Sequence, residues 1–170
     1  FMETLHISLW VVVVLVLVAL AFDFMNGFHD AANSIATVVS TGVLRPGQAV
    51  VFAAFFNGVA IFVFGYAVAA TMGKGLIDPK IVDIHIVFGA LIGGLVWNTV
   101  TWFYGIPSSS SHALAGGLLG AAISKAGASA VISSGFIKIV IFIFIAPLLG
   151  FILGSLLMVA VSWICRKSTP

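Results

Sequence analysis

The chain has 170 residues, of which 62% are hydrophobic and only 7% are charged. Its mean hydropathy is +1.27. A soluble domain carries about a quarter charged residues, so this composition excludes an ordinary soluble protein and predicts an all-α integral membrane protein. The formal net charge of +2 and the scattered basic residues give no support for a nucleic-acid partner, and we expect none.

The first part of the chain predicts a membrane span followed by a break. Residues 5–22 are apolar and long enough to cross the bilayer, which takes about 20 residues. They lack the basic start and small-residue cleavage site of a signal peptide, so we expect a retained first helix. Asp23, Asn26 and Gly27 then predict an interruption, and residues 29–39 a shorter helical piece.

The rest of the chain predicts further helices that alternate with polar loops. In chain order we expect a second span over residues 48–71, a charged loop over 73–80, a third span over 84–104, a Gly- and Ala-rich helix over 108–124 that spans only marginally or part-way, a polar loop over 125–135 and an apolar run over 136–165. The last run would measure about 45 Å as a helix, so a tilt or a kink at Pro147 is expected. Together these elements predict one transmembrane domain over residues 1–170, a helical bundle with broken helices.

The first polar motif lies in residues 26–34. Asp30 and Asn33 are three residues apart, and Asn26 and Ser34 lie four residues on either side of Asp30, so all four share one helix face. The carboxylate, amide and hydroxyl oxygens of these side chains suit a hard cation such as Na⁺, and Asp30 could instead carry a proton. The glycine of the motif would free backbone carbonyls to join the coordination. The alternative is that Asp30 caps a helix at the interface and Asn33 packs between helices.

Asn57 is the one strongly polar side chain in the second predicted span. It either belongs to the ion path or makes a bridging hydrogen bond to another helix, and the sequence favours neither. The candidate cation-binding residues are therefore Asp30, Asn26, Asn33, Ser34 and Asn57, with Asp30 as the metal ligand if the ion is Na⁺.

The second polar motif, residues 105–112, predicts a helix start. Pro107 at a first turn is followed by Ser108, Ser109, Ser110 and Ser111. The free N–H groups of a helix N-terminus and the serine hydroxyls would form a cradle of donors for an oxyanion. The alternative is a Ser-rich turn that caps a helix in water. His112 could also suggest a hydrolase, but adjacent helical side chains diverge by about 100° and no nucleophile-elbow pattern is present, so we expect no enzyme.

The two motifs together resemble the signatures of the inorganic phosphate transporter (PiT) family. Residues 26–34 are similar to the first signature in its bacterial low-affinity form, residues 105–112 resemble the second, and Trp97-Asn98 fits the same pattern. The resemblance implies a secondary carrier of phosphate coupled to Na⁺ or H⁺, without a further cofactor, built as one half of an inverted-repeat transporter. It implies that Asp30 and Asn33 serve the cation and substrate sites, and that Ser108 to Ser111 hold phosphate at the tip of a re-entrant hairpin.

The chain departs from the family pattern in three ways. Members carry the signature pair in both halves, whereas this chain has one pair and resembles an N-terminal half. The resemblance therefore implies a second transporter half or another copy of the chain as partner, besides phosphate and membrane lipid, and a location in the cell membrane of a bacterium or archaeon. His29 stands where many members have Asn, and Asn57 where Na⁺-coupled members often have Glu, so the coupling ion stays open. The alternatives are a carrier of sulfate or metal–phosphate and a membrane subunit that does not transport.

Overall fold

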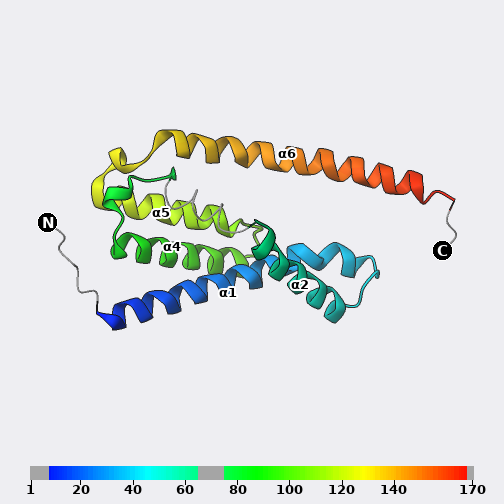
Figure 1. Ribbon diagram of the computed structural model, residues 1–170, viewed down its shortest axis with the longest axis horizontal. Helices are drawn as coiled ribbons and strands as arrows, with labels where there is room; N and C mark the ends of the chain where they lie inside the picture. Colours follow the sequence, from blue (N-terminus) through cyan, green and yellow to red (C-terminus); the bar gives the residue numbers. More distant parts are fainter. Residues whose placement is uncertain (1–7, 65–74, 168–170) are drawn as a thin grey trace. The chain divides into compact units, whose positions relative to one another are not determined.

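The computed structural model describes residues 8–64 and 75–167, and these are helical apart from turns, short loops and one isolated antiparallel bridge between Ile77 and Val131 (Figure 1). The long helices are α1 (Leu9–Ser40), α2 (Pro46–Phe64), α4 (Ile84–Phe103), α5 (Ser110–Ala126) and α6 (Ser133–Ile164). Within this part of the chain, four of them, namely α1, α2, α4 and α6, are long and apolar enough to cross a membrane. The chain is therefore a multi-pass membrane protein, which confirms the predicted all-α class.

The sequence divides into two compact units, Phe1–Val131 and Ile132–Pro170. In the second unit α6 continues through Pro147, and none of its residues is buried. The predicted apolar run is thus a single helix, and its exposed surface is apolar as expected for lipid contact. A single domain over 1–170 stays a prediction. Residues 5–7, 65–71 and 73–74 of the predicted segments lie outside the described residues.

Helix α1 runs without interruption through the first polar motif, so the predicted break at Asp23, Asn26 and Gly27 is wrong. A glycine inside a helix costs only about 1 kcal/mol relative to alanine. No proline removes a backbone donor here, and the other bonds of this 32-residue helix outweigh that cost. The carbonyls before Gly27 therefore stay within the helix, and the predicted freeing of backbone oxygens for an ion does not occur.

The turn between α4 and α5 is set by Gly105, whose φ of 65° is in the left-handed region. Its N–H donates to the Trp102 carbonyl at 3.0 Å, and the N–H of Ile106 donates to the Thr101 carbonyl at 2.8 Å. These two bonds close the end of α4 as a Schellman motif. Helix α5 then begins at Ser110, two residues after the predicted start at Ser108, and Pro107 precedes the helix.

Helices α4 and α5 pack as an antiparallel hairpin through small residues. A Cβ atom on Gly117 would lie only 2.5 Å from the carbonyl oxygen of Ala90, and one on Gly89 would lie 3.2 Å from the Cβ of Ala121. Such distances require the two backbones to approach closely, as small residues permit in membrane helices.

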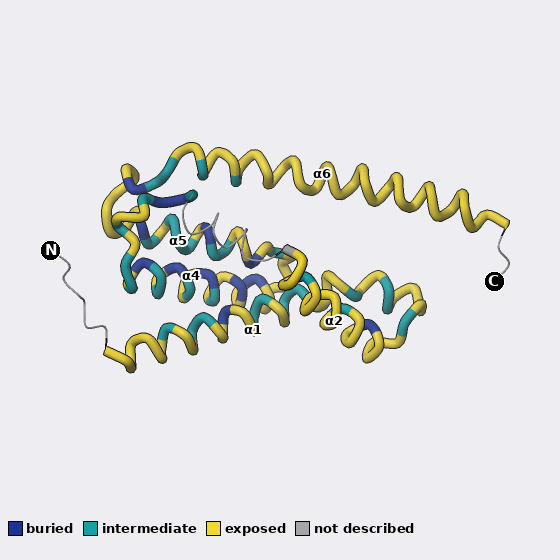
Figure 2. Tube along the Cα trace, in the orientation of Figure 1, coloured by how far each residue is buried: buried dark blue, intermediate teal, exposed yellow. Residues whose placement is uncertain are grey.

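Helix α4 carries the main buried stripe of this unit (Figure 2). Its buried residues recur every three or four positions and are Ile86, Ala90, Gly94, Asn98 and Thr101. Phe22 of α1 is also buried. A Cβ atom on Gly94 would lie only 2.8 Å from the Phe22 ring. Helix α4 is therefore packed between α1 and α5.

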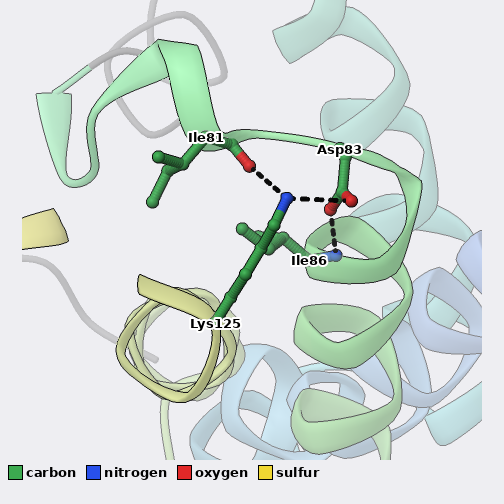
Figure 3. A network of polar contacts seen from close by, with 4 residues as sticks. All are labelled: Ile81, Asp83, Ile86 and Lys125. Carbon is green, nitrogen blue, oxygen red and sulfur yellow. Dashed lines mark hydrogen bonds and ion pairs between the residues drawn. The ribbon is translucent and has the colours of Figure 1, made fainter. Parts of the chain in front are cut away.

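An ion pair ties the N-terminus of α4 to the C-terminus of α5 (Figure 3). The Lys125 Nζ lies 2.9 Å from Asp83 Oδ2 and donates to the Ile81 carbonyl at 2.9 Å. Asp83 also caps α4, since its Oδ1 accepts the Ile86 N–H at 3.0 Å. The hydrogen bond from Lys125, with that from Ile86, holds the pKa of the Asp83 carboxyl below its ordinary value.

Candidate functional site

A pocket of about 460 Å³ opens between α1 and α2, and the polar side chains of the first motif line it. We call it the Asp30 pocket. Its polar lining residues are Asn26, Asp30, Ser34 and Asn57. The first three are spaced by four residues, so successive turns of α1 bring them to one face. Asn57 reaches the same pocket from α2, which places it with the other predicted cation-site residues.

Asn33 lies outside the Asp30 pocket and is exposed. Helix α2 approaches the side of α1 that carries Gly27 and Ala31, which also line the pocket. Asn33 stands at the opposite edge of the polar face, so the shared face predicted from the sequence is wider than the pocket. A role for Asn33 in binding substrate or cation stays a prediction.

The Asp30 pocket offers one carboxylate among neutral oxygen donors. The Ser34 hydroxyl donates to the Asp30 backbone carbonyl at 3.1 Å, so its oxygen lone pairs remain as acceptors. Within residues 8–64 and 75–167, Asp30 has no ion-pair partner, and no three His, Cys, Asp or Glu side chains cluster as a metal site. One carboxylate with amide and hydroxyl oxygens is a donor set for a hard monovalent cation or a proton, not for a transition metal.

The four serines of the second motif differ in their hydrogen bonds and in their burial. The Ser108 hydroxyl accepts from Trp97 Nε1 at 3.0 Å. Ser109 is the N-cap of α5, and its hydroxyl accepts the His112 N–H at 3.4 Å. Ser110 is buried, whereas Ser111 is exposed. The hydroxyls therefore do not converge as one cradle, and binding of phosphate by all four stays a prediction.

Two of these serines line a second pocket, of about 390 Å³, on the α4–α5 hairpin. Its other lining residues include Trp97 and His112, together with small residues such as Gly93 and Gly116. No residue of this pocket lines the Asp30 pocket. The second motif is thus divided between this open pocket and the buried Ser110.

Ser110 joins the two motifs directly. Its hydroxyl donates to the side-chain oxygen of Asn26, which lies 84 residues earlier in the chain. Asn26 therefore takes part in the Asp30 pocket and in the contact with the start of α5. The sequence motifs singled out both residues but gave no sign that they pair, because the pairing depends on how α1 packs against the hairpin. Asn98 is also buried, and the sequence indicates it only as part of the second signature.

Comparisons with known proteins agree with these features. The profile of the Phosphate transporter family matches residues 26–170. A Rhizobium meliloti (strain 1021) protein named "Probable low-affinity inorganic phosphate transporter" is 55% identical over 156 residues, which cover 92% of this chain and 47% of that protein. A Streptomyces halstedii protein of the same name is 44% identical over 167 residues, covering 96% of this chain and 76% of that protein.

A solved structure, "The sodium-dependent phosphate transporter", resembles this fold with a TM-score of 0.83 and 26% sequence identity. The similarity covers 91% of this chain and 40% of that one. The chain thus spans about half the length of the Rhizobium relative and less than half of the solved transporter.

Proposed function

Because the chain belongs to the phosphate transporter family, we propose that it forms part of a secondary carrier that moves inorganic phosphate with a coupling cation. It is a multi-pass protein of the cell membrane. Since it spans about half of its relative from Rhizobium, the working carrier includes a second half or another copy of the chain. Its chemistry is that of binding and release, not of an enzyme.

The Asp30 pocket is the site that we propose for the coupling cation. A carboxylate at membrane depth is costly when it is unpaired, and a bound Na⁺ or proton removes that cost. Asn26, Ser34 and Asn57 would supply neutral oxygens around Asp30. An oxygen-lined pocket with one negative charge fits both ions, so the choice between them belongs to the experiment.

The start of α5 is the site that we propose for the anion. A helix N-terminus offers free N–H groups and a partial positive charge without a fixed cation, so an oxyanion can bind and still leave. Ser108 and Ser109 line an open pocket at this end, and Ser110 adds a third hydroxyl on the side of α1. Neutral donors of this kind suit a carrier, which must release its cargo.

The observation that carries the proposal is the shared role of Asn26. It lines the Asp30 pocket and accepts the hydrogen bond from Ser110 at the start of α5. A cation that draws on the Asn26 oxygen would therefore change the contact that holds Ser110. Such a shared group provides a direct physical route for coupling between the two sites.

The test is uptake of labelled phosphate by proteoliposomes that contain the purified chain, alone or co-expressed with a second transporter half, under an inward Na⁺ gradient, an inward H⁺ gradient or neither. Labelled sulfate is measured in parallel, and saturable phosphate binding is measured on the detergent-purified chain. We expect gradient-driven phosphate uptake that exceeds sulfate uptake. Neither uptake nor saturable binding of phosphate would overturn the proposal, and uptake of sulfate in preference would replace phosphate with that anion.

A further inference from the structure

Asn98 is a buried polar side chain on α4. Its exposed fraction is 0%, and within residues 8–64 and 75–167 neither its Nδ2 nor its Oδ1 has a partner. A buried amide without a partner destabilises the state that holds it, because it has lost water without regaining a bond. In a membrane helix such a residue is expected to have a use in another state.

Three helices meet at the level of Asn98. A Cβ atom on Gly94, one turn earlier in α4, would touch the ring of Phe22 at 2.8 Å and the Cα of Leu114 at 3.6 Å. One turn beyond Phe22 in α1 is Asn26, and one turn before Leu114 in the antiparallel α5 is Ser110. The register of the helices therefore brings Asn98 to the height of the hydrogen bond between Asn26 and Ser110.

Contacts on the other side of this level support the same register. The rings of Phe28 in α1 and Trp102 in α4 have centroids 5.4 Å apart. Trp97 in α4 donates to Ser108 just before α5. Along α4, Asn98 thus lies between Trp97, which contacts the segment just before α5, and Trp102, which contacts α1.

At this level, Asn26 and Ser110 are hydrogen-bonded to each other, whereas the Asn98 side chain has no partner among the described residues. The Asn26 oxygen accepts the Ser110 hydroxyl, so the single proton of that hydroxyl is occupied. A carboxamide has two N–H donors and an oxygen acceptor, and among the described residues none of those of Asn98 has a partner. The Asn26 oxygen has two lone pairs, so a movement of α4 against α1 that brought Asn98 within reach would offer it an N–H donor that competes with the Ser110 hydroxyl.

We propose that Asn98 is a positioning residue of the carrier, whose carboxamide replaces Ser110 on Asn26 and so releases the Ser110 hydroxyl to the transported phosphate. This inference rests on the proposed function, since it needs phosphate as cargo. It gives the unpartnered amide a bond in the second state. It also makes the exchange at Asn26 the step that links the cation pocket to the anion.

Thr101 provides a matched control. It is also buried on α4, with an exposed fraction of 2%. Its hydroxyl donates to the Trp97 carbonyl at 2.9 Å within its own helix, so its single proton is already used. Thr101→Val removes a buried polar group of the same helix without touching the exchange.

The experiment measures phosphate uptake and thermal unfolding for Asn98→Leu, which keeps a similar branched shape, and for Asn98→Ala, which cannot clash. We expect a melting temperature at or above that of the wild type in at least one of the two, with the maximal uptake rate reduced about fivefold or more. Thr101→Val should keep uptake within about twofold of the wild type. A merely structural Asn98 would instead lower the melting temperature together with uptake.

A double variant isolates the partner. In the Ser110→Ala background the hydroxyl to be released is gone, so adding Asn98→Leu should change uptake by less than about twofold. The inference would be overturned if uptake were unchanged in both Asn98 variants, or if Asn98→Leu lowered uptake as much in the Ser110→Ala background as in the wild type. Uptake by the wild type would still support the proposed function. A wild-type chain that neither takes up nor binds phosphate would overturn both.

Discussion

The Ser110 hydroxyl donates a hydrogen bond to the Asn26 side-chain oxygen, across 84 residues of sequence. The bond joins the interior of a 32-residue helix to the first residue of another. It connects the two polar motifs that interrupt the apolar sequence, and it brings the candidate cation pocket next to the candidate anion end.

Removal of this bond should weaken the packing of α1 against the hairpin. Ser110→Ala leaves the Asn26 oxygen without its donor, and we expect a loss of about 1 kcal/mol in the free energy of unfolding. Ser111→Ala, at an exposed neighbouring position, should stay within about 0.5 kcal/mol. Thermal unfolding in detergent compares the two, and equal stabilities would contradict a structural role for the bond.

Close packing of the α4–α5 hairpin should depend on Gly117. A Cβ there would meet the Ala90 carbonyl oxygen at 2.5 Å, so Gly117→Ala must push the helices apart, at a cost of about 1–3 kcal/mol. A Cβ on Gly120 of the same helix meets nothing within 4 Å. Gly120→Ala should therefore be neutral or stabilise by up to about 1 kcal/mol. If both changes cost the same, the close approach of the backbones is not what the glycine provides.

The ion pair at the far end of the hairpin should make stability depend on pH. Folding lowers the pKa of Asp83 below its ordinary value of 3.8, which we take for the unfolded chain. The pair therefore stabilises above pH of about 4, and this stabilisation is lost as the pH falls through the lower pKa of the folded state. Melting temperatures of the wild type and Asp83→Asn at pH 7 and pH 3 measure the effect.

Asparagine is itself a good N-cap, so Asp83→Asn keeps the bond to Ile86 and removes only the charge. We expect the wild type to melt higher at pH 7, with the difference shrinking towards zero at pH 3. Lys125→Met should reproduce the loss at pH 7. A difference that grew on acidification would have the wrong sign for an ion pair.

Much of the fold follows from hydropathy and helix-ending residues. The predicted third span and last run correspond to α4 and α6, because each is a long apolar segment bounded by polar or turn-forming residues. The break predicted near Gly27 failed because glycine without proline does not end a long helix that has tertiary support. Helix α5 begins two residues after the predicted start at Ser108, since the Ser109 side chain caps the helix.

The candidate site was predictable only as a set of residue types. Helical spacing correctly brought Asn26, Asp30 and Ser34 to one pocket. It also included Asn33, because spacing defines a face but not the part of that face that α2 covers. The pairing of Ser110 with Asn26 and the burial of Asn98 depend on the register between three helices. A pattern within one helix carries no information on that register.

The most direct test of the central claim measures phosphate uptake into proteoliposomes under an inward cation gradient and compares the variants Asp30→Asn and Asp23→Asn. Both changes remove one carboxylate from α1, but Asp30 lines the pocket, whereas Asp23 is exposed outside it. We expect Asp30→Asn to lower gradient-driven phosphate uptake about tenfold or more, and Asp23→Asn to leave it within about twofold. Uptake that is insensitive to Asp30→Asn, or reduced equally by both, would contradict the cation site.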